Sequence, residues 1–276
     1  MKKKKSLTVL FIFLFAVRLF ALDGTAGRGD DGSPFSLHPA LDGILLTASA
    51  GLNGMVLYFD QVKKVNHLEF DGNNLDPSRI NAFDQWLTFP YSPVIDKLGT
   101  GLAIASILTP AILFSTPSNQ WLTIGTMYIE TLTLAYGLKE LGKLCISRAR
   151  PYMYFDDFPS EALEDYDWNR SFPSGHTTLA FAGASFTSFV FTKYYPDSKW
   201  KIPVIASSYA IAVGTAVCRI ASGEHFTTDV VVGALTGALC GLFVPWIHTL
   251  DFGIKDNSSS ISLQVAPTRA TLSIKF

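Results

Sequence analysis

The sequence predicts an all-α membrane protein: a bundle of five to six transmembrane helices with a functional site at one membrane face. Hydrophobic residues make up 48% of the 276 residues and charged residues only 16%, which is too apolar for an ordinary soluble enzyme. Six apolar segments follow one another, each near the lower limit of about 17 residues for a span. Most are rich in Gly, Ala, Ser and Thr, which let helix backbones approach closely.

The first forty residues precede the predicted bundle. Four lysines lead into an apolar run from Leu7 to Val17, and Ala21 offers a small residue at a cleavage point. The run is short for a bilayer span but fits the core of a secretory signal, so residues 1–21 are predicted to be a signal peptide. Leu19 matches the small-residue rule poorly, so an uncleaved anchor is the alternative. Residues 22–40 form a polar, glycine-rich linker.

The bundle is expected to occupy residues 41–250. Its predicted helices run approximately over Leu41–Phe59, Leu98–Ser115, Trp121–Leu138, Thr177–Thr192, Ile202–Cys218 and Val230–Trp246. The tail, residues 251–276, alternates apolar and polar residues around a Pro-Thr turn. This period of two favours a short hairpin.

The loops predict an orientation. Residues 192–201 carry three lysines, whereas residues 149–171 carry many carboxylates, so the lysine loop is expected in the cytoplasm and the acidic loop outside. A cleaved signal followed by six spans would put the acidic loop inside. We therefore expect five true spans in the bacterial cell membrane. The segment expected not to span is Leu41–Phe59, with Asp42 at its start and Asn53 near its middle; it would lie on the surface or pack on the bundle.

Composition also excludes some functions. With 22 basic and 23 acidic residues, the chain gives no indication of nucleic-acid binding. Cys145, Cys218 and Cys240 lie in or beside apolar segments at spacings that fit no metal site. They are interpreted as small buried hydrophobic residues, and no structural disulfide or cofactor is predicted.

The first of three polar motifs is KLCISRARP. Lys143 and Arg150 are seven residues apart, two helical turns, so a helix would place both on one face. Pro151 discourages continuation of that helix. Taken alone, the pair is more typical of basic side chains that extend toward the interface from the end of a span.

The second motif is FPSGH. A helix beginning at Ser174 or Gly175 leaves backbone N–H groups unpaired, and these groups with the helix dipole favour a phosphate or similar anion. Glycine lets the backbone approach the ligand closely. His176 is either a proton donor beside that anion or an interfacial histidine.

The third motif is CRIASGEHFTTD. His225 and Asp229 are four residues apart and share a face in the first turn of the last helix. A carboxylate there can accept a hydrogen bond from one imidazole nitrogen, which fixes the tautomer and leaves the other nitrogen as a nucleophile or base. Capping of the helix by Asp229 is the alternative.

The predicted topology brings all three motifs to one mouth of the bundle. Three cations, a helix N-terminus and two histidines describe a site for phosphoryl transfer, whose transition state needs fixed donors to its equatorial oxygens. No metal-ligand cluster accompanies them in the motifs, so the cations would take the place of Mg²⁺. The residues are Lys143, Arg150, Ser174, Gly175, His176, Arg219, His225 and Asp229.

In this order, K-x6-R-P, P-S-G-H and R-x5-H-x3-D resemble the three-part signature of the type 2 phosphatidic acid phosphatase family. Its superfamily includes bacterial acid phosphatases and vanadium haloperoxidases. The resemblance covers Lys143 to Asp229. One departure is visible: the family usually has Ser-Arg in the third motif, whereas Cys218 precedes Arg219 here. That serine is at most a secondary phosphate contact.

The resemblance implies a role for each residue. His225 attacks phosphorus and forms a phosphohistidine, oriented by Asp229. His176 protonates the leaving oxygen and later activates water. The phosphoryl oxygens are held by Lys143, Arg150, Arg219, Ser174 and the Gly175 amide.

Glu130 lies off this pattern, inside the third predicted span. It precedes Lys143 by thirteen residues, about 20 Å along a helix, which is too far for direct catalysis. A hydrogen-bonded packing role and a substrate contact in the bundle interior both fit.

The leading functional hypothesis is a phosphatase acting on a lipid phosphate or pyrophosphate, because membrane spans place the site at headgroup depth. Lipids that the resemblance suggests are undecaprenyl pyrophosphate, phosphatidylglycerol phosphate, phosphatidic acid and lipid A phosphates. The alternatives are transfer of the phosphoryl group to another acceptor and a non-catalytic lipid-phosphate binder or transporter. The complete histidine pair favours an enzyme, since binding needs only the cations. The sequence predicts neither the lipid nor an oligomeric state.

Overall fold

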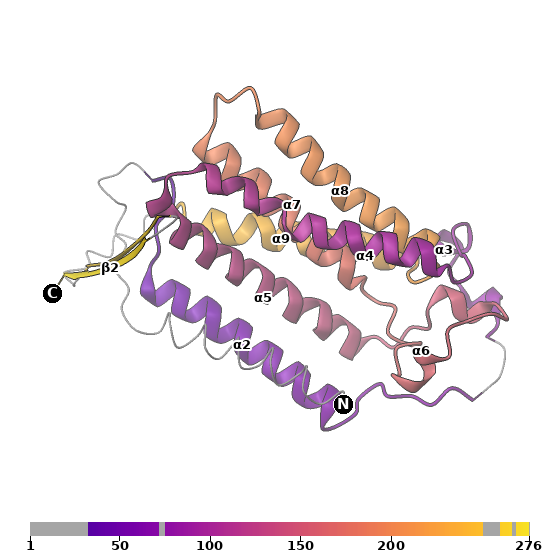
Figure 1. Ribbon diagram of the computed structural model, residues 1–276. Helices are drawn as coiled ribbons and strands as arrows, with labels where there is room; N and C mark the ends of the chain where they lie inside the picture. The colour runs from indigo at the N-terminus through magenta and orange to yellow at the C-terminus, as the bar shows by residue number, and fades with distance from the viewer. Residues whose placement is uncertain (1–32, 72–74, 251–259, 267–268, 276) are drawn as a thin grey trace.

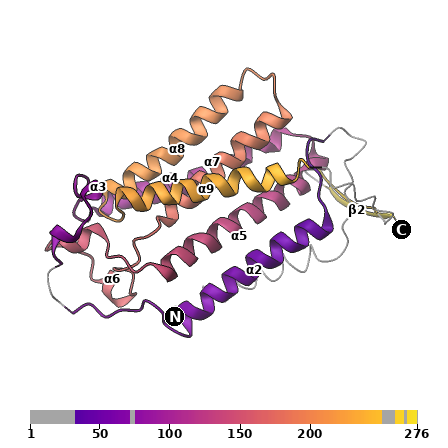
Figure 2. The same ribbon diagram turned by 180° about the vertical axis from the view of Figure 1, so that it is seen from behind.

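In the part of the chain that the structure describes, six long helices lie side by side in one bundle and alternate in direction (Figures 1 and 2). The computed structural model describes residues 33–71, 75–250, 260–266 and 269–275. The predicted signal peptide and residues 22–32 of the predicted linker lie outside these residues. The helices are α2 Pro39–Gln61, α4 Pro93–Ile107, α5 Trp121–Cys145, α7 Gly175–Tyr194, α8 Lys201–Ala221 and α9 Thr227–Ile247. The predicted all-α bundle is therefore confirmed.

Short elements join the helices at the two ends of the bundle. They are η1 Pro77–Arg79, α3 Ala82–Gln85, η2 Thr109–Ser115, η3 Ser118–Gln120, η4 Pro151–Tyr154 and α6 Glu161–Glu164. In the tail, β1 Ser260–Ala266 pairs antiparallel with β2 Arg269–Lys275. Figures 1 and 2 show α3 and α6 at one end of the bundle and β2 at the other. We call these the α3 end and the hairpin end.

The described helices make the chain a multi-pass membrane protein. Four segments are long and apolar enough to cross a bilayer: Pro39–Gln61, Pro93–Ser115, Lys201–Ala221 and Thr227–Ile247. Their outward faces expose large apolar side chains such as Val213, Val217, Leu235 and Leu239, as contact with lipid requires. α5 and α7 are more polar.

α7 tolerates this polarity because other helices surround it. It packs against α4, α5, α8 and α9, so its Thr and Ser side chains are buried by protein rather than by lipid. Its approach to α9 is close: a Cβ on Gly237 would lie 1.9 Å from the carbonyl oxygen of Thr178. Small residues are therefore required along this contact.

The expectation that segment 41–59 does not span is not supported. It forms α2, a 23-residue helix of span-like hydropathy that packs along α5. Asp42 and Asn53 do not expose polar groups to lipid, because both turn inward: Asp42 contacts His248 of the bundle, and the Asn53 amide donates to the carbonyl oxygens of Ser49 and Thr133. Because α2 is long and apolar enough to cross the membrane and runs from the hairpin end to the α3 end, residue 33 and the α3 end lie on opposite sides of the membrane. A cleaved signal peptide would put residue 33 outside and the site inside, which conflicts with the orientation predicted from the loops. The signal peptide on which this conflict depends lies outside the described residues.

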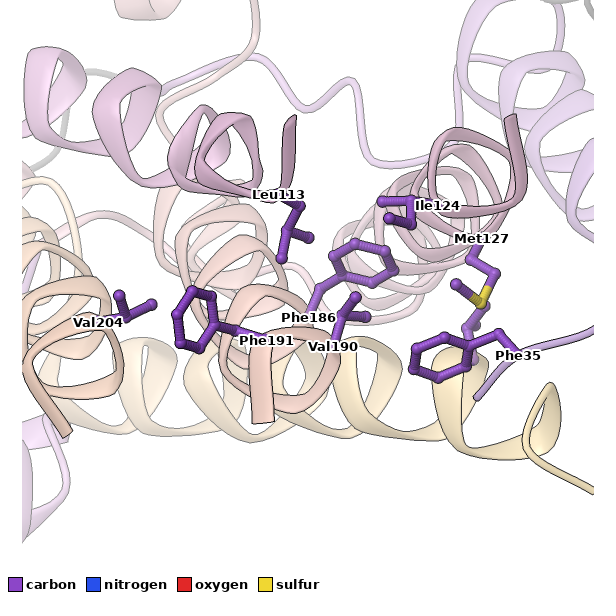
Figure 3. Packing of buried hydrophobic residues seen from close by; sticks show 9 residues of the cluster. Phe35, Leu113, Ile124, Met127, Phe186, Val190, Phe191 and Val204 are labelled. Carbon is purple, nitrogen blue, oxygen red and sulfur yellow. The ribbon is translucent and has the colours of Figure 1, made fainter. Parts of the chain in front are cut away.

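The apolar core lies in the half of the bundle near the hairpin end (Figure 3). Phe186 and Val190 of α7 meet Leu113 of η2 and Met127 of α5 there. The buried cluster consists of Phe35, Leu113, Ile124, Met127, Phe186, Val190, Phe191, Val204 and Val244. The half of the bundle near the α3 end holds the buried cationic side chains of Lys139, Arg150 and Arg219.

Candidate active site

All three sequence motifs reach the α3 end, as the topology predicts. The C-terminal end of α5 carries Lys143, the N-terminus of α7 carries Ser174 to His176, the last turns of α8 carry Arg219, and His225 precedes α9. The match between each residue and a catalytic role stays a prediction; the geometry shows which roles are possible.

The predicted helix through Lys143 and Arg150 is wrong beyond Cys145. α5 ends at Cys145, and Ile146 and Arg150 have extended backbone angles. The Arg148 amide donates to the Asn169 carbonyl and the Arg150 amide to the Trp168 carbonyl, so residues 146–150 run beside the 167–171 segment instead. Lys143 and Arg150 nevertheless interact electrostatically.

His225 is almost completely buried and held in one orientation. Its Nδ1 lies 2.7 Å from the carbonyl oxygen of Ser171. A carbonyl only accepts, so Nδ1 carries the proton and donates it. Its Nε2 lies 3.4 Å from a guanidinium nitrogen of Arg150. In the neutral imidazole this tautomer leaves the Nε2 lone pair available beside a cation.

The charge state of His225 follows from the same surroundings. Burial lowers the pKa of His225 well below 6.5, and the positive charges of Arg150, Arg219 and Lys143 lower it further. The imidazole is therefore neutral at neutral pH. A neutral imidazole with a free Nε2 lone pair is the form that acts as a nucleophile.

Asp229 does not accept the predicted hydrogen bond from His225. Its Oδ2 lies 4.0 Å from the imidazole Nδ1, because the Ser171 carbonyl occupies that position. The carboxylate instead accepts from the Ser171 hydroxyl at 2.5 Å and from the Phe226 amide at 2.9 Å, and it pairs with Arg148. Asp229 therefore positions both the segment that holds His225 and the start of α9.

Two arginines of the motifs are linked by a carboxylate that the sequence analysis missed. Glu224 accepts from a guanidinium nitrogen of Arg150 and lies 3.1 Å from a guanidinium nitrogen of Arg219. Burial alone would lower the pKa of Arg150, but Asp167 and Glu224 raise it, so its charge is retained. Asp167 accepts from Arg150 at 2.6 Å, and Asp96 accepts from Arg219. The two guanidinium groups are thus fixed before any ligand arrives.

The position of Glu224 depends on a left-handed turn. Gly223 has a φ of +72°, which favours glycine. A Cβ there would lie 2.5 Å from the Phe89 carbonyl oxygen. Glu224 is adjacent to His225 in the sequence, and this adjacency was the signal that could have indicated a role in the site. The spacing of residues could not predict that Glu224 pairs with Arg150 and Arg219.

His176 lies in the first turn of α7 among the same cations. Its Nε2 is 3.4 Å from the Thr100 hydroxyl of α4, and its imidazole interacts electrostatically with Arg219, Lys143 and Arg150. It also interacts with His225. The two imidazoles therefore share one charged site, as the predicted acid and nucleophile require.

The start of α7 differs from the expectation in one respect. The Ser174 hydroxyl is buried and lies 2.9 Å from the Thr177 hydroxyl, so it already has a partner within the helix start. A Cβ on Gly175 would lie 3.1 Å from Cδ and 3.5 Å from Nζ of Lys139. Lys139 thus adds to the site a cation that the sequence analysis missed. Its position four residues before Lys143 predicts that both lysines lie on the same face of α5, so the spacing could have indicated it.

A scaffold from distant segments supports α9. Asp84 of α3 is fully buried and accepts from the Thr228 amide at 2.9 Å and from Arg148 at 2.6 Å. Burial alone would raise the pKa of Asp84, but hydrogen bonds from Thr228 and Arg148 lower it, so the carboxylate stays ionised. The contact joins residues 144 positions apart, and nothing in local spacing indicated it.

The interpretation of the cysteines as buried residues holds for Cys240 and is wrong for Cys145, which is exposed, while Cys218 is half-buried. Cys145, Cys218 and Cys240 are free thiols. Cys218 points toward α4, where its Cβ would lie 2.9 Å from a Cβ on Gly99. The residue before Arg219 is thus a contact between α8 and α4. Among the described residues, the grouping suited to a metal ion is Asp42, Glu130 and His248 near the hairpin end, away from this site.

Comparison with known proteins gives a match to one family model over part of the chain. The sequence model of the PAP2 superfamily matches residues 125–252. This segment contains every predicted site residue.

Curated relatives share about half of the chain. The bacitracin transport permease protein BcrC of Bacillus licheniformis is 37% identical over 131 residues, which cover 46% of this chain and 60% of that protein. The lipid A 1-phosphatase of Porphyromonas gingivalis is 31% identical over 138 residues, 49% of this chain and 26% of that protein. The undecaprenyl-diphosphatase of Sulfolobus acidocaldarius is 27% identical, with 48% and 55% covered. The chain thus spans 60% or less of the length of these relatives.

Two solved structures are similar in outline. Aquifex aeolicus LpxE has a TM-score of 0.40 at 24% identity, covering 64% of this chain and 98% of that one. The PAP2 type phosphatidylglycerolphosphate phosphatase of Bacillus subtilis has a TM-score of 0.43 at 21% identity, covering 79% and 98%.

Proposed function

Residues 125–252 belong to the PAP2 superfamily, and from this premise we propose that the protein is a membrane phosphatase hydrolysing a lipid phosphate or pyrophosphate through a phosphohistidine. The observation that carries the proposal is the orientation of His225. Its Nδ1–H is fixed on the Ser171 carbonyl, and its Nε2 lone pair faces the charged site beside Arg150. A histidine buried only for packing would not need a fixed tautomer among cations.

In the first step, His225 Nε2 attacks phosphorus, and the bond from phosphorus to the lipid oxygen breaks. Arg150, Arg219 and Lys143 hold the phosphoryl oxygens, and their fixed charges stabilise the transition state. His176 gives its proton to the leaving oxygen. The negative charge of a bound phosphate favours the protonated imidazole of His176.

In the second step, water attacks the phosphohistidine. His176 takes a proton from that water, the bond between Nε2 and phosphorus breaks, and inorganic phosphate leaves. All proton transfers and the phosphoryl contacts use side chains of this chain, so the chemistry needs no divalent cation. The Gly175 amide adds a backbone donor at the α7 N-terminus.

An apolar depression beside the site supports a lipid substrate. A cavity of about 530 Å³ is lined by Phe83, Trp86 and Leu87 of the α3 region and by Thr227 at the start of α9. Trp86 is 87% exposed and Phe83 66%. Thr227 lies two residues from His225 in the sequence, so this apolar surface adjoins the segment that carries the proposed nucleophile.

The names of the relatives favour two substrate classes for testing. One relative is named for lipid A 1-phosphate and another for undecaprenyl diphosphate. We propose both as candidate substrates for this chain, together with phosphatidylglycerol phosphate and phosphatidic acid. The Lys-rich turn between α7 and α8 lies at the hairpin end, and the positive-inside rule puts that end in the cytoplasm. The site then opens on the extracytoplasmic side of a bacterial cell membrane.

The test is phosphate release from a panel of these lipids by the detergent-solubilised chain in EDTA. We expect release from at least one lipid, inhibition by vanadate, and loss of release in His225→Ala with unchanged thermal unfolding. Arg79→Ala, an exposed arginine remote from the motifs, serves as the control. Binding of lipid phosphate without release would instead support the binder or transporter, and label appearing on an added alcohol rather than in free phosphate would support transfer.

A further inference from the structure

A second polar cluster lies near the hairpin end. Asp42 in the first turn of α2, Glu130 in α5 and His248 at the end of α9 bring their side chains together. One ligand atom from each lies within 4.8 Å of the others. Thirteen residues of α5 separate Glu130 from Lys143, about 20 Å, so the cluster is not part of the phosphate site.

The tautomer of His248 presents a lone pair to the two carboxylates. Its Nδ1 lies 2.8 Å from the Val244 carbonyl oxygen, which only accepts, so Nδ1 carries a proton. Nε2 lies 2.9 Å from Oδ1 of Asp42 and 3.4 Å from Oε2 of Glu130. A neutral imidazole would therefore turn its lone pair toward two anionic oxygens. Such an arrangement requires a cation or an extra proton between them.

Glu130 is the group least satisfied by the protein. It is 1% exposed, and neither of its carboxylate oxygens has a hydrogen-bond partner among the described residues. The ion pairs that Asp42 and Glu130 form within the described chain are those with His248. A buried carboxylate left this way is strongly unfavourable. The hydrogen-bonded packing role expected for Glu130 is thus not what the structure shows.

We propose that Asp42, Glu130 and His248 bind a divalent transition-metal cation such as Zn²⁺ or Mn²⁺. Imidazole nitrogen with two carboxylate oxygens is a donor set suited to these ions. Tetrahedral ligands about 2.05 Å from Zn²⁺ lie about 3.3 Å apart, close to the 3.4 Å between His248 Nε2 and Glu130 Oε2. That separation is long for a hydrogen bond but suits two atoms that share an ion.

The cation fastens a peripheral helix to the bundle. α2 packs chiefly on α5 and lies at the outer edge in both views (Figures 1 and 2). The proposed ion would join α2 to α5 and to the C-terminal end of α9. Its role is therefore to hold the helices together, and phosphoryl transfer does not depend on its chemistry.

The experiment uses the full chain purified in detergent without added metal and then equilibrated with Zn²⁺, Mn²⁺ or Mg²⁺. We expect about one Zn²⁺ or Mn²⁺ per chain by elemental analysis, and little Mg²⁺. Glu130→Gln and Asp42→Asn keep the side-chain shapes but lose ligand charge, and each should weaken Zn²⁺ binding at least about 100-fold. His67→Asn, a histidine outside the cluster, should bind like the parent chain.

Thermal unfolding supplies the second measurement. Adding Zn²⁺ to the metal-free chain should raise its melting temperature by several degrees and leave that of Glu130→Gln unchanged. If a variant does not fold, titration of Zn²⁺ into the parent chain and Asp42→Asn decides. No Zn²⁺ or Mn²⁺ bound by the parent chain, or equal binding by the variants, overturns the proposal and indicates that a proton alone occupies the cluster.

Discussion

The imidazole Nδ1 of His225 lies 2.7 Å from the carbonyl oxygen of Ser171, while the carboxylate of Asp229 lies 4.0 Å away. The carboxylate reaches the histidine through Ser171, whose hydroxyl donates to it at 2.5 Å. A backbone carbonyl therefore fixes the tautomer, and Asp229 fixes the backbone.

Because Asp229 acts on His225 through Ser171, we predict that Ser171 is a residue that positions the imidazole. Ser171→Ala removes a hydrogen bond to a charged group, worth about 1.5–3 kcal/mol, and should lower kcat roughly 10- to 100-fold. KM should change little, because the phosphate-binding cations stay in place. Steady-state kinetics on the preferred lipid give both constants.

The matched comparison is Asp229→Asn combined with Ser171→Ala. If both residues act through one carbonyl, the double variant should be scarcely slower than the slower single variant. Multiplicative losses would contradict the relay and restore a direct contact between Asp229 and His225.

The surroundings of His225 predict the pH dependence. Burial and then the charges of Arg150, Arg219 and Lys143 lower its pKa below 6.5, so the nucleophile stays neutral as the pH falls through 6.5. The acid limb of kcat/KM due to this group should lie below pH 6.5. In Arg219→Gln one cation is lost, which raises the pKa of His225, so the limb should move to higher pH.

Ionisation of the substrate affects the parent chain and Arg219→Gln equally, so it does not contribute to the difference between their pH profiles. The position of the limb is read from kcat/KM, which reports the free enzyme. An acid limb that stays in place, or moves to lower pH, in Arg219→Gln would show that the cations do not control the protonation of His225.

The position of Glu224 predicts that its carboxylate competes with phosphate for Arg150 and Arg219. Its carboxylate pairs with both Arg150 and Arg219, so an incoming phosphate must share or displace those contacts. Glu224→Gln keeps an acceptor oxygen but removes the negative charge, and should strengthen binding of inorganic phosphate or vanadate about 5- to 10-fold, well below the limit for two unscreened charges. Inhibition constants provide the measurement.

Glu161→Gln is the matched control, because Glu161 lies in α6 away from these arginines. It should leave the inhibition constant for vanadate unchanged. Weaker anion binding by Glu224→Gln would mean that the carboxylate mainly orients the guanidinium groups.

The sequence predicted the fold and the placement of the three motifs at one end of the bundle where the signal was local. Motif spacing is enough to place His176 and Gly175 at a helix start and His225 before the next helix. The apolar segments similarly predict α8 and α9. Resemblance to a phosphatase family added roles that spacing alone could not assign.

What the sequence could not predict depends on chain segments folding back. Asp84 reaches Thr228 across 144 residues, and Asp167 reaches Arg150 from a loop without regular pattern. The Ser171 carbonyl replaces Asp229 as the partner of His225 because the 146–150 segment leaves the helix and pairs with 167–171. Every residue has a backbone carbonyl, so the pattern of side chains in the sequence does not predict which carbonyl will accept such a hydrogen bond.

The alternating directions of the helices predict the sides of the membrane on which two loops lie. Asp157, in the loop between α5 and α7, and Asp197, between α7 and α8, are both exposed. In a background in which Cys145, Cys218 and Cys240 are replaced, Asp157→Cys should react with an impermeant maleimide in intact spheroplasts. Asp197→Cys should react only after the membrane is opened; the reverse pattern would place the site in the cytoplasm.

The central claim is that His225 carries the phosphoryl group. The direct measurement is rapid quench of the detergent-solubilised chain with phosphorus-labelled lipid phosphate, followed by peptide mapping under alkaline conditions that preserve phosphohistidine. The account predicts label on the peptide containing His225, more of it in His176→Ala, and none in His225→Ala. Label on another residue, or continued phosphate release by His225→Ala, would contradict it.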